Sequence, residues 1–349
     1  MLAYFLSLLM RIIRNKWIGL FVVLGATQLA ALGAELNVYS HRHYGTDQKV
    51  NALFTEKTGI VVNVVNAEVD QLVERLRSEG ESSPADVLVA VNASRLQRAA
   101  AEGLLQKVET PTLKERTPTA MRSPEGYWYP FTMRARVIVA AKDRVKEGEI
   151  TSYEDLAKPE WRGRLLSRSS TSSYNQALLA SIVAANGEEA ATKWAESIVN
   201  NMARPPQGGD RDQIKAVASG LADVAITNSY YLGLLLNSKD ADERAAGESV
   251  RIIFPNTDGR GTHTNVSCAG IAKHSKNVAE ATQYLEFLLS DEVQKLYANE
   301  TFEHPVSMDL SISEQLQKWG EFKVDEETFP QLGESTPAAI RIFDKVGWK

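Results

Sequence analysis

Between residues 35 and 103, apolar and polar positions switch repeatedly between the spacing of a strand and the spacing of a helix. Strands are predicted at 35–39, 60–65 and 86–91, and helices at 47–58, 69–76 and 93–103. The strands are continuously apolar, and each predicted helix connects one strand to the next or follows the last. This order predicts an α/β fold with a parallel sheet that helices cover on both faces.

The pattern changes at residues 132–140, a predicted strand that carries Arg134 and Arg136 near its start. We interpret it as a strand that crosses between two lobes. A strand at 250–255 is expected to return to the first lobe. Further strands are predicted at 164–167 and 223–226, and helices at 153–156, 176–186, 188–200, 210–219, 277–289, 291–299 and 312–318.

The N-terminal segment has the pattern of an export signal. Three basic residues between positions 11 and 16 precede the uncharged apolar run 17–34, which ends in small residues. Residues 1–34 are therefore predicted to be a signal peptide, or an N-terminal membrane anchor if they stay uncleaved. Met10 is an alternative start. Cleavage would leave an exported mature chain that begins near Glu35.

Composition narrows the class of protein. Hydrophobic residues make up 44% of the chain and charged residues 24%, with a mean hydropathy of -0.25, which fits a globular protein with two cores. The formal charge is -5 and no Lys/Arg-rich tract is present, so nucleic acid is not an expected partner. Cys268 is the single cysteine, which excludes an intramolecular disulfide and a cysteine-based zinc site.

Tyrosines follow the predicted strands at the ends where open α/β sheets bind ligands. Tyr44 follows the first strand, Tyr174 follows the strand at 164–167, and Tyr230 and Tyr231 follow the strand at 223–226. If these loops face one cleft, four phenols and the imidazole of His43 converge there.

Such a cluster selects among metal ions. A phenol has an ordinary pKa of about 10, so only a strongly acidic cation ionises several phenols at neutral pH. Mg²⁺ and Ca²⁺ prefer carboxylates and carbonyls, and Zn²⁺ prefers nitrogen and sulfur. The tyrosines therefore predict Fe³⁺ as the bound ion.

Two other kinds of protein are less consistent with this sequence. A receptor of the same architecture for an organic or oxyanion solute would use hydroxyls and helix N-termini, which Ser172, Ser173 and Ser229 could supply. A hydrolase is disfavoured because no Gly-x-Ser-x-Gly motif is present. We therefore expect a binding protein and not an enzyme.

Several motifs, in order along the chain, resemble one family. They are 39–44 (YSHRHY), 134–137 (RARV), 153–163 (YEDLAKPEWRG), 210–214 (DRDQI), 228–233 (NSYYLG), 261–265 (GTHTN) and 287–290 (FLLS). They resemble the ferric-iron-binding class of periplasmic solute-binding proteins, most closely the Fut kind and more distantly the Fbp kind. The resemblance covers nearly the whole chain after the export signal.

The resemblance implies a two-lobed periplasmic-binding-protein fold of class II, which is transferrin-like, with a hinged cleft. Its lobes would consist of 35–131 with about 255–300 and of about 135–252 with about 305–349, joined by crossing strands near 132–139 and 250–255.

The resemblance also implies a site and partners. Tyr44, Tyr174, Tyr230 and Tyr231 match the metal-binding tyrosines, and His43 matches a position that is a ligand in some members. A monomer would carry Fe³⁺ to an inner-membrane ABC permease and its ATPase.

Arg134 matches a basic residue that lies beside the site, where it would hold a neighbouring phenolate. The sequence departs from the family pattern at His41, at Cys268 and at Leu234 or Leu235, where some members carry a basic residue. Fe³⁺ with four phenolates carries one negative charge. Because the basic residue of some members is absent here, the sequence does not indicate which cation balances that charge.

Overall fold

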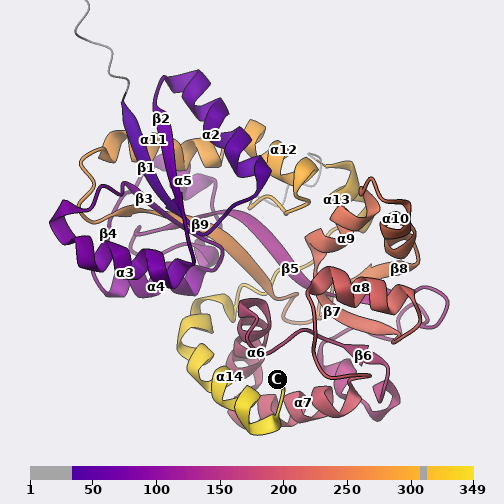
Figure 1. Ribbon diagram of the computed structural model, residues 1–349. Helices are drawn as coiled ribbons and strands as arrows, with labels where there is room; N and C mark the ends of the chain where they lie inside the picture. Colours follow the sequence, from indigo (N-terminus) through magenta and orange to yellow (C-terminus); the bar gives the residue numbers. More distant parts are fainter. Residues whose placement is uncertain (1–33, 307–312) are drawn as a thin grey trace, which may run out of the picture.

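One mixed sheet runs through both lobes of the molecule in the computed structural model, which describes residues 34–306 and 313–349 (Figure 1). Its strand order is β2-β1-β3-β9-β5-β7-β6, with β4 paired to β9 and β8 paired to β5. The predicted export signal lies outside the described residues except for Ala34.

The strands are short except for β5 and β9. Their bounds are β1 Glu35–Ser40, β2 Val61–Asn66, β3 Val87–Ala90, β4 Leu105–Gln106, β5 Tyr129–Ala141, β6 Leu165–Leu166, β7 Val224–Asn228, β8 Val250–Ile253 and β9 Thr264–Ala272.

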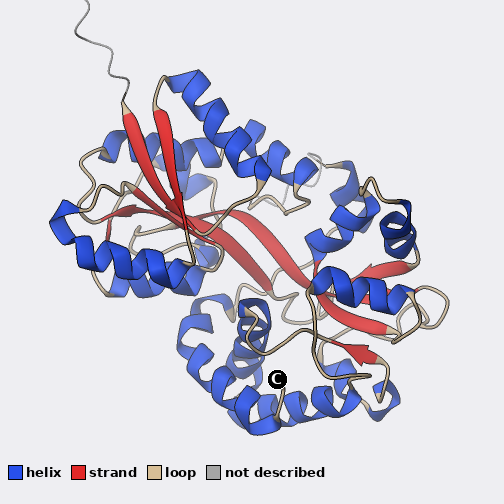
Figure 2. Cartoon of the chain, viewed as in Figure 1, coloured by secondary structure: helices blue, strands red, loops and turns tan. Residues whose placement is uncertain are grey.

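Helices pack around the sheet in both lobes, as Figure 2 shows. The α-helices are α2 Gly45–Thr58, α3 Val69–Glu79, α4 Ala93–Ala101, α5 Pro111–Glu115, α6 Ser173–Asn186, α7 Glu188–Asn201, α8 Asp210–Ala218, α9 Ser229–Leu236, α10 Ala241–Glu248, α11 Val278–Leu288, α12 Asp291–Glu300, α13 Glu314–Trp319 and α14 Leu332–Val346. Short 3-10 helices lie at Gly80–Ser82, Thr119–Met121, Glu154–Ala157, Pro159–Trp161 and Phe329–Gln331, the last of which is η6.

We define the first lobe as β1 to β4 with α2 to α5, α11 and α12, and the second lobe as β6 to β8 with α6 to α10 and α14 (Figure 1). The predicted parallel arrangement holds for β1, β2 and β3 and for β6 with β7. The pairings of β3 with β9 and of β5 with β7, β8 and β9 are antiparallel. The sheet is therefore mixed. The prediction of burial on both faces also fails for β2, because β2 lies at the edge of the sheet and most of its side chains reach solvent.

The strand β5 runs between the two lobes (Figure 1). Its first half, 129–135, pairs with β9, and its second half, 136–141, pairs with β7 and β8. Every residue of β5 is buried, including Arg134 and Arg136. The two arginines are two residues apart on one strand, so their side chains leave the same face.

The second crossing strand is β9 and not the segment 250–255. Strand β8, at Val250–Ile253, pairs with residues 138–141 of β5 in the second lobe. Strand β9 pairs with β3 and β4 on one side and with β5 on the other. The strand β9 was not predicted, because the polar residues Thr264, Asn265 and Ser267 interrupt its apolar pattern. All nine of its residues are nevertheless buried.

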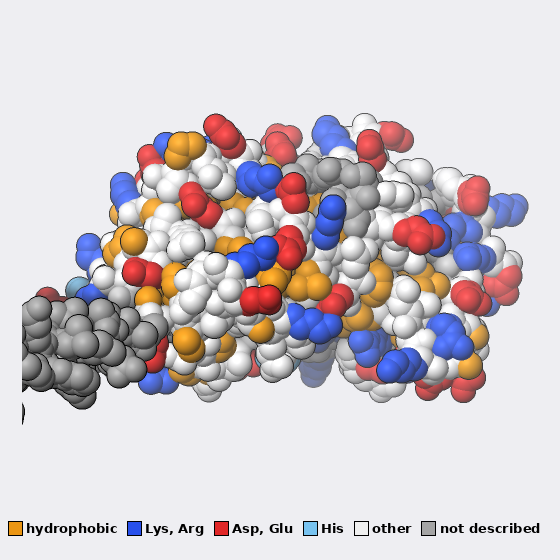
Figure 3. Space-filling view, turned by 90° about the horizontal axis from the view of Figure 1, so that it is seen from above, with side chains coloured by type: hydrophobic (Ala, Val, Ile, Leu, Met, Phe, Trp, Pro, Cys, Tyr) orange, Lys and Arg blue, Asp and Glu red, His pale blue; other side chains and the backbone are white. Residues whose placement is uncertain are grey.

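Two further features complete the fold. Among the described residues, none of the helices has both the length and the apolar character needed to span a bilayer. On the face drawn in Figure 3, acidic and basic side chains are interspersed and do not gather in one patch of a single sign.

Candidate metal centre

Tyr44 lies at the N-cap of α2, directly after the loop that leaves β1. Its backbone N–H donates to Oδ2 of Asp47 at 3.0 Å, which fixes the start of the helix. The exposed ring of His43 stacks on Tyr44 with 5.5 Å between ring centroids and 22° between planes. The first lobe thus presents a phenol and an imidazole side by side.

Tyr174 lies in the first turn of α6, because this helix begins at Ser173 rather than at the predicted residue 176. The next residue, Asn175, is buried, and its Nδ2 donates to the backbone oxygen of Arg168 at 2.7 Å. This bond anchors the helix start to the loop that follows β6.

Tyr230 and Tyr231 lie in the first turn of α9, which follows the fully buried strand β7. Their ring centroids are 4.1 Å apart. Tyr230 is 2% exposed, and its hydroxyl has no hydrogen-bond partner among the described residues. A buried hydroxyl without a partner is unfavourable in the metal-free protein, so the position is suited to a bound ligand.

The structure brings all four predicted tyrosines together. Burial raises the pKa of Tyr44, and a negative charge on Tyr174 would raise it further. Burial raises the pKa of Tyr230 well above its ordinary value, with Tyr174, Tyr231 and Tyr44 adding to the effect. Burial and Tyr174 raise the pKa of Tyr231 to about 12. The phenols of Tyr44, Tyr230 and Tyr231 are therefore neutral at physiological pH without a cation.

Arg134 lies within this cluster. It is fully buried, and its guanidinium carbon is 5.9 Å from the ring centroid of Tyr174. Its Nη2 donates to the backbone oxygen of Val91 at 2.5 Å, while Nε and Nη1 have no hydrogen-bond partner in the described chain. Burial lowers the pKa of Arg134, but Tyr174 and Glu303 raise it by more, so the side chain stays charged.

A buried carboxylate that the sequence did not indicate lies behind Arg134. Oε1 of Glu303 is 3.6 Å from Nε of Arg134, and both carboxylate oxygens accept from Arg42, at 3.0 and 2.9 Å. The guanidinium of Arg42 lies 5.0 Å from the ring centroid of Tyr44. Burial raises the pKa of Glu303, but Arg42 and Arg134 lower it by more, so its carboxyl group is ionised.

A second buried network holds the other tyrosines in place. Nη1 of Arg136 donates to Asp210 at 2.6 Å, and Nη2 donates to Oδ1 of Asn175 at 2.7 Å. Asp210 also accepts from the backbone N–H of Asn228 at 2.9 Å. Asn175 follows Tyr174, and Asn228 lies two residues before Tyr230, so one arginine fixes the starts of both helices.

The segment around Phe302 contacts the helix of the tyrosine pair. Phe302 has a positive φ of 56° and packs against Gly233 of α9. A β-carbon at Gly233 would lie 2.5 Å from Cγ of Phe302, so only glycine fits there.

Three of the other histidines, His304, His263 and His41, lie in structural settings. The buried ring of His304 packs among Phe254, Phe322 and Trp319, as expected for a structural histidine. His263 is likewise buried, and burial lowers its pKa to about 3. His41, which departs from the family pattern, has its Nε2 3.2 Å from Oε2 of Glu68.

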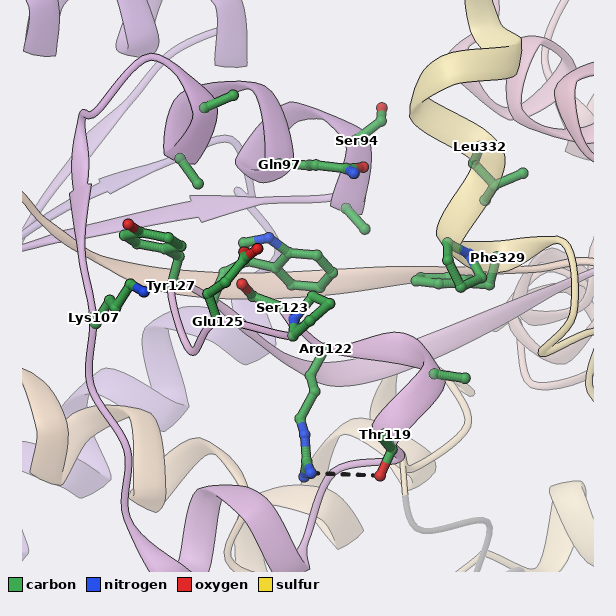
Figure 4. Close-up of a pocket in the computed structure, with 17 residues that line it drawn as sticks. Ser94, Gln97, Lys107, Thr119, Arg122, Ser123, Glu125, Tyr127, Phe329 and Leu332 are labelled. Carbon is green, nitrogen blue, oxygen red and sulfur yellow. Dashed lines mark hydrogen bonds between the residues drawn. The ribbon is translucent and has the colours of Figure 1, made fainter.

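One pocket borders the first of the four tyrosines, and a larger pocket lies elsewhere. One, of about 250 Å³, includes Arg42, His43 and Tyr44 in its wall. A larger pocket, of about 580 Å³, lies between α4, the loop 119–128 and the chain around η6 (Figure 4). Figure 4 shows Gln97, Tyr127 and Phe329 on different sides of it. None of the four tyrosines lines this larger pocket.

Comparison with known proteins gives a consistent result. The family model for bacterial extracellular solute-binding proteins matches residues 49–324. The iron uptake protein A1 of Synechocystis is 45% identical over 315 residues, which cover 90% of this chain and 88% of that protein.

Solved structures of similar proteins point to the same family. The Trichodesmium protein IdiA (FutA), in complex with iron and citrate, superposes with a TM-score of 0.86 at 43% identity, over 90% of this chain and 100% of that one. The ferric binding protein of Campylobacter jejuni gives a TM-score of 0.84 at 41% identity, over 90% of this chain and 100% of that one. The predicted two-lobed periplasmic-binding-protein fold is confirmed. The chain therefore belongs to the bacterial extracellular solute-binding proteins, within the group of iron uptake and ferric-binding proteins.

Proposed function

We propose that this protein binds Fe³⁺ through the phenolates of Tyr44, Tyr174, Tyr230 and Tyr231. The observation that carries the proposal is the cluster itself, in which Tyr44, Tyr174 and Tyr230 lie near Arg134 and the buried Tyr230 hydroxyl has no well-formed hydrogen bond in the described residues. Fe³⁺ supplies the positive charge that ionises phenols whose pKa burial has raised.

Two neighbouring side chains assist in this proposal. Nε and Nη1 of Arg134 are free to donate to the phenolates once these form. His43, stacked on Tyr44 and exposed, is placed to become a further ligand.

The iron-bound protein serves uptake. Tyr44 belongs to the first lobe and the other tyrosines to the second, so iron contacts both lobes and favours their closure. We propose a monomeric, non-enzymatic carrier, exported to the periplasm, that delivers Fe³⁺ to an inner-membrane ABC permease and its ATPase. The relatives named for iron uptake and iron binding support this role.

An oxyanion is the second candidate ligand. The hydroxyls of Ser172 and Ser229 are buried and without hydrogen-bond partners in the described residues, and both residues lie at helix N-termini. Four phenols are poor partners for an anion, which favours iron.

Titration of the metal-free protein with ferric citrate separates the two candidates. The iron proposal predicts a strong visible phenolate-to-iron charge-transfer band that saturates at one equivalent. If no band develops in folded protein, the tyrosinate site is wrong, and thermal-shift screening of oxyanions and organic solutes becomes the next measurement.

Iron affinity should rise with pH. The phenols are protonated in the metal-free protein, because the pKa values of Tyr44, Tyr230 and Tyr231 lie above the ordinary value, so iron binding releases protons. The apparent affinity should gain about one decade per pH unit for each phenol that ionises. Competition against citrate between about pH 6 and 8, corrected for citrate protonation and iron hydrolysis, measures the slope. A slope of zero would contradict phenolate ligation.

A further inference from the structure

The buried charges behind the tyrosines are largely neutralised by one another. Arg42 pairs with Glu303 at 2.9 Å and with Asp47 at 2.9 Å, and Arg134 lies 3.6 Å from the same Glu303. Two guanidinium groups thus face two carboxylates on the first-lobe side. This group has no net charge to offset an anionic metal complex.

The second-lobe side differs because it carries one more arginine. Asp210 pairs with Arg136 at 2.6 Å, while its other oxygen lies 3.8 Å from Nη1 of Arg168. That distance is too long for a hydrogen bond. Asp210 therefore neutralises Arg136, and the positive charge of Arg168 is not matched by a second carboxylate in this group.

Arg168 is held against a predicted ligand. Its guanidinium carbon lies 5.6 Å from the ring centroid of Tyr174, whose ring also lies 5.9 Å from that of Arg134. Its backbone oxygen accepts from Nδ2 of Asn175 at 2.7 Å and from Nε1 of Trp348 at 3.1 Å. These bonds fix the backbone at Arg168, and the side chain is 25% exposed, so its charge is partly screened by solvent.

We propose that Arg168 is the positioning residue whose charge balances the iron complex. This rests on the proposed function, in which Fe³⁺ with four phenolates carries one negative charge. The neighbouring arginines and carboxylates leave one positive charge, that of Arg168, beside Tyr174.

Arg168→Gln should weaken Fe³⁺ binding by about tenfold, the effect of one partly screened charge at this distance. Loss of the cation raises the energy of the Tyr174 phenolate electrons, so the charge-transfer band should move to longer wavelength. Arg168→Lys keeps the charge and should retain most of both properties. Full-length protein, titrated with Fe³⁺ against citrate and followed by visible absorption, gives both readouts.

Arg164→Gln is the matched control. Arg164 lies in the same lobe with its guanidinium 4.8 Å from the ring centroid of Trp161, and it pairs with Asp223, which precedes β7 at the end opposite Tyr230. This variant should bind iron as the wild type does. If the wild type shows no charge-transfer band, the proposed function fails.

The inference about Arg168 fails separately. It is overturned if the wild type binds iron and Arg168→Gln matches it in affinity and band position. Equal losses in Arg168→Gln and Arg168→Lys would also overturn it, because charge would then not be the cause. Far-UV circular dichroism on each variant establishes that it is folded.

Discussion

Replacing Tyr230 by phenylalanine should weaken Fe³⁺ binding more than about a hundredfold, since even residues that only support a metal ligand commonly cost 10- to 100-fold. The same change should stabilise the metal-free protein by about 1 kcal/mol. The Tyr230 hydroxyl is buried without a well-formed hydrogen bond, so its removal ends an unfavourable desolvation and loses at most a weak contact with Tyr231. Urea unfolding of metal-free protein and iron competition with citrate measure the two effects.

Tyr129→Phe provides the control for that prediction. Tyr129 is also buried, but its hydroxyl donates to the backbone oxygen of Val108 at 2.7 Å. Its loss should lower the free energy of unfolding by about 1 kcal/mol and leave iron binding unchanged. Unaltered iron affinity in Tyr230→Phe would remove Tyr230 from the ligand set.

Arg136→Met should lower the free energy of unfolding by about 3–5 kcal/mol, because it leaves the buried Asp210 without its cation. Iron affinity should fall as well, since Asn175 and Asn228 lose the donor that fixes the starts of α6 and α9. Urea unfolding and visible iron titration on one preparation show both losses.

Adding Asp210→Asn to Arg136→Met removes the unpaired charge and should recover part of the stability. Arg75→Met serves as the control, because Arg75 is half exposed and its ion pair with Glu79 is expected to contribute little to the free energy of unfolding. A loss below about 1 kcal/mol in Arg136→Met would show that the buried pair does not hold the second lobe together.

The fold could be predicted from sequence where local patterns and tertiary structure agree. The strand β5 and the helices α2, α3 and α4 follow directly from apolar periodicity. The helix α14 escaped prediction because Pro337 lies inside it, and proline normally ends a helix. The prediction that 250–255 returns to the first lobe is wrong, because the apolar pattern of a strand does not indicate which strand it pairs with.

In the candidate site, too, local features could be predicted and long-range contacts could not. Tyr44, Tyr174, Tyr230 and Tyr231 were found because each follows a strand, which is a local signal. The contact between Arg42 and Glu303 joins residues 261 positions apart, and no local pattern reports it. The roles of the tyrosines and of Arg134 in binding metal stay predictions until iron is titrated.

The position of Cys268 gives the molecule an internal reporter of sheet opening. This single cysteine lies fully buried in β9, between β3 and β5, with Sγ 3.9 Å from the backbone oxygen of Ala90. Burial raises the pKa of its thiol, so an alkylating reagent reacts only after the central strands separate. The rate at which Cys268 is labelled in the unmodified chain therefore reports the free energy of that opening. A change in this rate on addition of iron would show how strongly a ligand that contacts both lobes restrains the strands between them.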